Sequence, residues 1–249
     1  MDPVTVVFYV LLLAIGAYVQ TVTGFALGLF VMGIAALVEL DSVAASAAIV
    51  TISSLVNTLM ALAREHHHVN WPLVRRMSLG LIPAMLLGVS LLHYLSQELQ
   101  ALLRLLLGGF IVTGAVILTL KPHPRMQPAS GIKSVLFGMA SGLFGGLFST
   151  GGPPAVYHLY REPIAVSTVR MTLLAVFTIS TLARLLVIVP AGHVSTSVVW
   201  VCVVGAPVII GFTWLGQRFV PPISDTGMRR LAFFILLVIG LTLLASVFK

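Results

Sequence analysis

The chain has 249 residues, of which 59% are hydrophobic, and it carries only 14 Lys and Arg and 7 Asp and Glu. About a quarter of the residues of a soluble domain are charged, so this composition excludes an ordinary soluble fold and makes the lipid bilayer the expected solvent. The net charge of +7 indicates membrane topology rather than nucleic-acid binding, because Lys and Arg gather in cytoplasmic loops.

Eight apolar runs, with all seven acidic residues at their edges, predict the membrane elements, since a spanning helix needs about 20 apolar residues. The runs are 4–38, 42–63, 72–95, 99–120, 132–158, 163–189, 194–217 and 229–248. The first 13 residues lack the basic stretch of a secretory signal and are interpreted as the start of the first membrane segment. Six runs suit single crossings, and the first and fifth do not.

The run 4–38 is too long for one ordinary span and carries Gln20, Thr21, Thr23 and Gly24 at its middle. We expect either a helical hairpin that enters and returns or two full crossings. The run 132–158 is interrupted by two glycines and two prolines at 151–154. Proline removes a backbone donor and ends helices, and a broken helix is tolerated at membrane depth only inside protein or beside a water-filled cavity.

The distribution of positive charge favours re-entrant hairpins for both broken runs. With hairpins, ten Lys and Arg lie on one side of the membrane and only Lys249 lies on the other. If each broken run crossed the membrane once instead, the same Lys and Arg residues would divide seven to four between the two sides. The positive-inside rule therefore predicts two hairpins, with both termini outside.

The second half of the chain echoes the first at an offset of 123 to 126 residues. Phe25 and Gly28 match Phe148 and Gly151, and similar pairs continue to the end of the chain. We therefore predict an all-α polytopic membrane protein of two inverted repeats, 1–121 and 132–249, joined by a linker at 122–131. Each repeat is expected to be a broken or re-entrant helical hairpin followed by three transmembrane helices, an architecture that places a binding site near the bilayer midplane.

The two breaks supply hydrogen-bond donors suited to an oxyanion. A helix that starts after a break directs free N–H groups and a partial positive charge into the gap. The candidate ligands are Gln20, Thr21, Thr23, Gly24, Ser149, Thr150, Gly151 and Gly152. The alternative is that the glycines only allow close helix packing.

Two arginines lie inside the run 163–189. Arg170 and Arg184 are fourteen residues apart and share a helix face with Thr181, while Asn57 is a related polar position in the first half. No acid is expected at membrane depth to pair with them, so a transported anion is the predicted partner. The alternative is that both side chains extend to the membrane surface.

The remaining polar residues carry separate predictions. His158 is a candidate for proton coupling, with an interfacial anchor as the alternative. The run at 66–68, three histidines, is interpreted as a solvated loop and not as a metal site, and the single Cys202 as a packing residue. No cofactor is expected.

These features favour a secondary transporter of small anions that works by alternating access. A transporter of metal cations is an alternative, opposed by the lack of carboxylates within the runs. An intramembrane enzyme using Ser149 and His158 is another, opposed by the lack of an orienting acid. The expected partners are a small anion and the bilayer, with no nucleic acid, and a homodimer is one possible assembly.

The segments TVTGFALGLFVMG at 21–33 and SGLFGGLFSTGGPPAVYHLY at 141–160 resemble the sulfite exporter TauE/SafE family. The resemblance covers essentially the whole chain and implies a permease of the bacterial inner membrane. It implies sulfur-containing or organic anions, such as sulfite or sulfonates, as substrates. The family's glycine-rich hairpins fall on Thr23-Gly24 and on Ser149 to Pro154.

Overall fold

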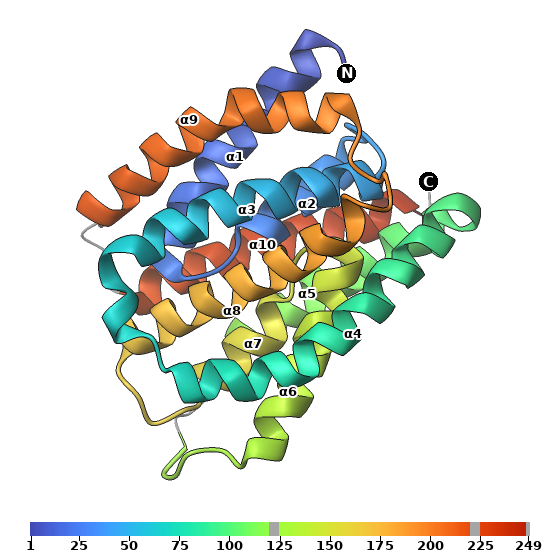
Figure 1. The fold of residues 1–249 in the computed structure, drawn as a ribbon. Helices are drawn as coiled ribbons and strands as arrows, with labels where there is room; N and C mark the ends of the chain where they lie inside the picture. The colour runs from blue at the N-terminus through green and yellow to red at the C-terminus, as the bar shows by residue number, and fades with distance from the viewer. Residues whose placement is uncertain (120–124, 220–224, 248–249) are drawn as a thin grey trace.

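A computed structural model describes residues 1–119, 125–219 and 225–247, and every regular element in these ranges is helical. The elements are α1 (Pro3–Thr23), α2 (Leu27–Leu37), α3 (Val43–Glu65), the 3-10 turn η1 (His66–His68), α4 (Trp71–Glu98), α5 (Gln100–Thr119), α6 (Gly131–Phe148), α7 (Gly152–Leu159), α8 (Val166–Ile188), α9 (Thr196–Arg218) and α10 (Asp225–Val247) (Figure 1). The predicted boundary between the repeats at 121–122, and Lys249, lie outside the described residues.

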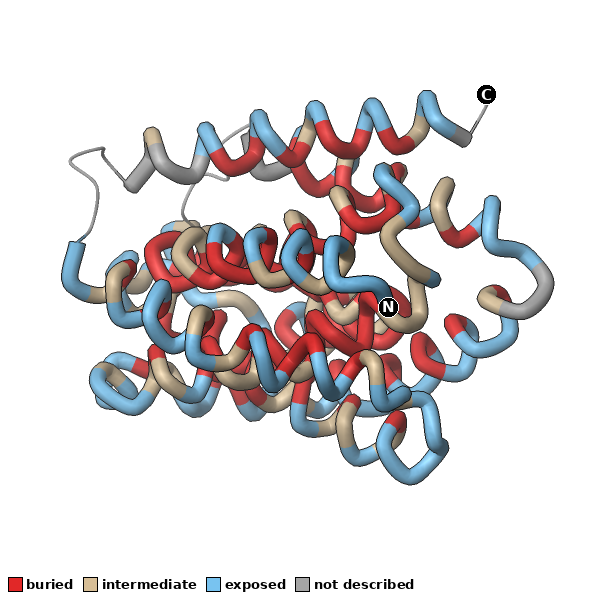
Figure 2. Tube along the Cα trace, turned by 90° about the horizontal axis from the view of Figure 1, so that it is seen from above, coloured by how far each residue is buried: buried red, intermediate tan, exposed pale blue. Residues whose placement is uncertain are grey.

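Among the described residues, six helices are long and apolar enough to cross a membrane. They are Pro3–Thr23, Val43–His68, Trp71–Ser96, Gly131–Phe148, Val166–Ile188 and Thr196–Arg218. Their outer faces carry exposed apolar side chains such as Leu79 and Leu186, whereas the buried residues face inward (Figure 2). The prediction of an all-α polytopic membrane protein is confirmed.

Both broken runs fold into hairpins with one long and one short arm. In the first, α2 returns along α1, so that a side chain at Gly16 would contact Leu27 and Val31. The short arm α2 has 11 residues and is roughly 16 Å long, about half of the ~30 Å hydrocarbon core. The first run therefore does not form two full crossings. In the second hairpin the arms are α6, with 18 residues, and α7, with 8.

The connections gather at two ends of the molecule (Figure 1). At one end, which we call the basic end, the backbone N–H of Arg125 donates to the carbonyl of Arg161, and that of Asn70 to Thr172. At the opposite end, Glu39 pairs with Arg104, and the rings of His93 and His193 stack. The N-terminus lies at the opposite end, as the hairpin topology predicts.

Helix packing partners exchange between the two halves. Helix α1 packs on α9, and its counterpart α6 packs on α4. In the same way α2 packs on α10 and α7 on α5. Helix α3 packs on α9, and its counterpart α8 packs on α4. This is the exchange expected if α1–α5 correspond to α6–α10. An origin as two inverted repeats stays a prediction.

Helices α4 and α6 are in backbone contact because glycines line both. A methyl group at Gly138, Gly142 or Gly146 would collide with the backbone of α4, and one at Gly80 or Gly88 with that of α6. Small residues repeated every four positions are a common device for tight helix packing in membranes. This contact fixes the long arm of the second hairpin, and with it the position of the break.

Candidate functional site

The two hairpins meet inside the molecule. A side chain at Gly28, in the first turn of α2, would contact Thr150 and the carbonyl of Ser149 in the second break. A cavity of about 20 Å³ lies at this contact. It is lined by Gln20, Ala26, Gly28, Ser54, Ser149, Thr150, Gly151, Gly152, Phe177, Ser180 and Thr181. A space of this size holds about one water molecule.

The breaks use backbone conformations that favour glycine. Gly24, Ala26 and Ser149 have φ values of 85°, 93° and 54°. Only glycine adopts positive φ without cost, so the surrounding contacts must hold Ala26 and Ser149 in place. At the second break, the Ser141 hydroxyl donates to the carbonyl of Gly151 over 2.7 Å and ties the turn to α6.

The two short arms differ in the donors they offer. The first bond of α2 runs from the N–H of Phe30 to the carbonyl of Ala26, so the amides of residues 27–29 have no partner within the helix. In α7, by contrast, residues 153 and 154 are prolines and carry no N–H. The first hairpin therefore presents more backbone donors, and the second contributes mainly hydroxyl groups and its helix dipole.

A short chain of side chains leads from the second break toward the opposite end. The Ser149 and Thr51 hydroxyls are 2.7 Å apart, and Nη1 of Arg184 donates to Thr51 over 3.4 Å. The single hydroxyl hydrogen of Thr51 has the carbonyl of Ala47 as its acceptor at 2.6 Å. Its lone pairs are then left to accept from Ser149 and Arg184.

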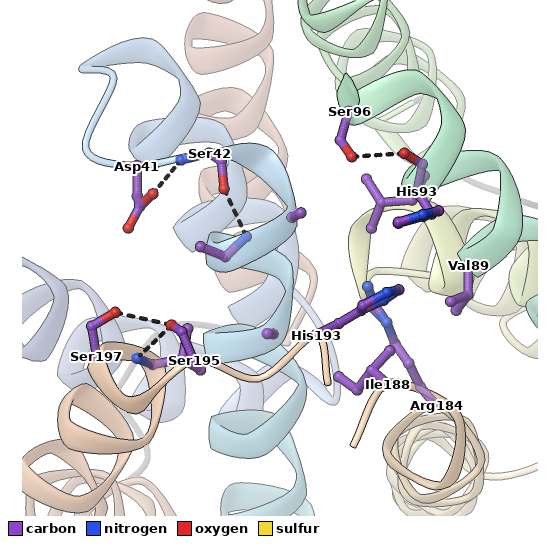
Figure 3. A pocket seen from close by; sticks show the side chains of 15 residues that line it. Asp41, Ser42, Val89, His93, Ser96, Arg184, Ile188, His193, Ser195 and Ser197 are labelled. Atoms are coloured by element: carbon purple, nitrogen blue, oxygen red, sulfur yellow. Dashed lines mark hydrogen bonds between the residues drawn. The ribbon is translucent and has the colours of Figure 1, made fainter. Parts of the chain in front are cut away.

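Arg184 lies at the base of a larger pocket of about 390 Å³ (Figure 3). The pocket is open toward the opposite end and is also lined by Asp41, His93, His193, Ser195 and Ser197. Arg184 is only 2% exposed, and its Nε has no hydrogen-bond partner. No carboxylate in the described ranges lies within ion-pair distance of its guanidinium. A buried cation thus lies between an open pocket and the break.

Of the residues predicted for the site, Gln20, Ser149, Thr150, Gly151, Gly152 and Thr181 line the cavity. The Gln20 amide donates to Ser54 over 3.2 Å, and Thr181 donates to the carbonyl of Phe177.

Four other predicted residues hold the helices or the first break. Nδ2 of Asn57 lies within hydrogen-bond distance of the carbonyl of Ala17 and of the hydroxyls of Thr21 and Thr213, so it joins α1, α3 and α9. Thr23 donates to the carbonyls of Val19 and Phe25 and stabilises the first break. Gly24 packs against the backbone of α8 at Arg170.

The expectation that neither arginine has an acidic partner is wrong for Arg170. Its Nη2 lies 3.3 Å from Oε2 of Glu65, at the C-terminus of α3 near the basic end. Glu65 is close to Arg170 because α3 and α8 pack side by side, although the two residues are 105 positions apart. Arg170 lies beside the first break rather than in the cavity.

His158 lies in a packed network close to the basic end. Its Nε2 is 3.1 Å from the Ser134 hydroxyl and 3.9 Å from Glu162, and its ring stacks on Phe137. Glu162 also binds Arg125 over 2.7 Å and accepts from the backbone of Ala129. The pairing of Ser149 with His158 that an enzyme would need is not formed, because each has a different hydroxyl partner.

Sequence reasoning missed Thr51, Ser54 and Ser180. On α3, Thr51, Ser54 and Thr58 follow the i, i+3, i+7 spacing of one helix face, and on α8 Ser180 and Arg184 stand four positions apart, next to Thr181. This polar spacing within apolar helices was the available signal.

The spanning helices, the two broken hairpins and the polar cavity between them define a multi-pass membrane protein of the transporter class. The chain belongs to the sulfite exporter TauE/SafE family, whose model matches residues 8–243. It is also similar to a probable sulfite/organosulfonate exporter TauE of Cupriavidus necator, with 37% identity over 233 residues that cover 94% of this chain and 91% of the relative. No solved structure matches the chain significantly. Family membership confirms the predictions of a transporter and not an enzyme.

Proposed function

We propose that this protein exports small sulfur-containing oxyanions or organosulfonates across the bacterial inner membrane by alternating access. The observation that carries the proposal is the buried guanidinium of Arg184, which lacks an acidic partner in the described chain and faces an open pocket. A cation at this depth needs an anion or water as its partner. The family and the name of the Cupriavidus necator relative supply the substrate class.

The two hairpins act as gates on either side of the central cavity. Toward the opposite end, the contacts of Thr51 with Ser149 and with Arg184 close the cavity from the open pocket. Toward the basic end, Gly24 rests on α8, and the Tyr160 hydroxyl donates to the carbonyl of Thr23 over 3.4 Å. An anion larger than water enters the cavity only when one of these contacts opens, so we assign this arrangement to an occluded state of the proposed cycle.

The donors around the cavity suit the oxygens of a sulfite or sulfonate group. Hydroxyl groups from Ser54, Thr150 and Ser180 and the amides at the start of α2 can donate to an oxyanion. Hard cations prefer anionic oxygen ligands, and no carboxylate lines the cavity among the described residues. This chemistry favours an anion over a metal ion.

By the positive-inside rule we place the basic end in the cytoplasm and the termini outside. Export then runs from the gate at Gly24 to the gate at Ser149 and past Arg184. His158 lies off this path, so a part in proton coupling, which stays a prediction, would be indirect. A homodimer likewise stays a prediction.

Ligand-dependent thermal stability of the purified protein tests the proposal. Sulfite or methanesulfonate at a hundred times its Kd is expected to stabilise the protein by about 2.7 kcal/mol. Arg184→Gln should weaken the affinity about tenfold or more, because it removes a charge-assisted hydrogen bond. The matched control is Arg170→Gln, whose parent side chain is paired with Glu65 outside the cavity.

Two results would overturn the proposal. One is that every anion stabilises Arg184→Gln and wild type against heat to the same extent. The other is stabilisation by metal cations alone. Loss of sulfite flux from loaded proteoliposomes in Arg184→Gln connects binding to transport.

A further inference from the structure

An apolar groove lies between α5, α6 and α7, on the other side of the second hairpin from the polar cavity. Its volume is about 680 Å³, and its walls include Leu106, Gly109, Phe110, Phe137, Phe144 and Tyr157. Pro153 and Pro154 form the part of the wall that directly follows the second break. A ligand in this groove would therefore contact the short arm that carries one of the two gates.

The groove is slightly longer than one membrane leaflet is thick, because it reaches from Phe137 near the basic end to Leu105, next to Arg104 at the opposite end. The rings of Phe110 and Phe144 stack at 3.9 Å and so lie at the same level. From Phe137 to Phe144 on α6, and on from Phe110 to Leu105 on α5, the lining covers roughly 18 Å at 1.5 Å per residue. Half of the hydrocarbon core is about 15 Å, which a single acyl chain fills.

Two cations lie where the groove ends near the basic end. Lys133 is exposed one helical turn before Phe137, and Arg161 follows Tyr157 by one turn. Arg161 donates from Nη1 to the Tyr157 hydroxyl over 2.7 Å, and its Nε has no hydrogen-bond partner. Neither cation forms an ion pair with a carboxylate that the structure describes.

We propose that this groove binds an anionic phospholipid, with one acyl chain along α5 and α6 and the phosphate on Arg161 and Lys133. A bare hydrocarbon would explain the apolar walls but would leave the two cations without an anionic partner. A free phosphate would leave the groove unfilled. An anionic phospholipid of the leaflet at the basic end presents an acyl chain and an anionic head group together.

Glycine substitutions provide a matched test of the acyl-chain site. A side chain at Gly109 would meet nothing within 4 Å, and the same holds for Gly211 on the exposed face of α9. The Cβ of Gly109→Leu therefore stands in open space at the groove wall, and Gly211→Leu makes the same change elsewhere. Dioleoyl phosphatidylglycerol added to delipidated protein should raise the Tm of wild type and Gly211→Leu but not that of Gly109→Leu.

The head-group contact is tested by lipid charge and by Lys133→Gln, alone and with Arg161→Gln. Each lost cation should weaken the affinity for phosphatidylglycerol about fivefold, and phosphatidylcholine should bind more weakly than phosphatidylglycerol to wild type. Equal responses to the two lipids, or an unchanged response of Gly109→Leu, would overturn the proposal. So would stabilisation by glycerol phosphate alone, since it has no acyl chain.

Discussion

Thr51 joins the second break to the buried arginine through a single hydroxyl group. It accepts from both Ser149 and Arg184, so Thr51→Val removes the link while keeping the shape of the side chain. Loss of a hydrogen bond of about 1 kcal/mol from the closed state should raise the population of the open gate about fivefold. The measurement is the reaction rate of Thr150→Cys with a sulfonate-bearing methanethiosulfonate reagent applied from the opposite end.

The chain suits this measurement because its one cysteine, Cys202, is buried and can be replaced by alanine. Thr178→Val is the control, since the Thr178 hydroxyl is also buried but donates only to the carbonyl of Leu174 on its own helix. If Thr51→Val and Thr178→Val change the rate equally, the contact at Ser149 is not a gate.

The roles of single residues were only partly predictable. The sequence gives the chemical group that each residue carries, but not the hydrogen-bond or ion-pair partner that the fold brings to it. Arg170 and Arg184 carry the same group on the same helix, yet only Arg170 has an acid as its partner. That acid, Glu65, lies 105 positions away, and no residue near Arg170 in the sequence indicates that the two will pair. Asn57 was interpreted as a ligand because it is polar at membrane depth, but its amide holds three helices together.

At the scale of elements, the contact of α6 with α4 depends on glycines without side chains. Gly142→Ala would place a methyl group against the carbonyl of Leu81 and should destabilise the protein by about 1–3 kcal/mol. Gly211→Ala, in open space on α9, should instead be neutral or stabilise by up to about 1 kcal/mol through helix propensity. Unfolding in mixed micelles of increasing SDS fraction measures both free energies, and the two changes must differ in sign or size for the packing argument to hold.

The breaks themselves were predictable because proline and glycine act on the backbone locally. The sequence predicts breaks at residues 20–24 and 149–154, and these overlap the observed breaks at 24–26 and 149–151, where the helices end and restart. The lengths of the arms were not predictable. Where α1 stops and α2 returns depends on contacts with α8, such as that of Gly24 with Arg170, which no local pattern encodes.

At the scale of the molecule, the two breaks touch each other but have different neighbours on the surrounding helices. The first break lies near the basic end beside Arg170, the second lies toward the opposite end beside Thr51, and the first turn of α2 contacts the second break between them. Each hairpin can therefore close the cavity from one side only. Two gates of this kind are what alternating access requires, because only one is open at a time.

The same arrangement predicts which end faces the cytoplasm. Gln127 lies in the exposed segment before α6 at the basic end, and Ala191 in the exposed loop between α8 and α9 at the opposite end. Cysteines placed at these positions, with Cys202 replaced by alanine, report the side of the membrane. Because positive loops stay inside, a membrane-impermeant maleimide should label Ala191→Cys in intact cells and Gln127→Cys only after permeabilisation of the inner membrane. The reversed labelling pattern would mean that the basic end faces outward. The gates would be unchanged, but the pocket at Arg184 would be the cytoplasmic entrance instead of the exit.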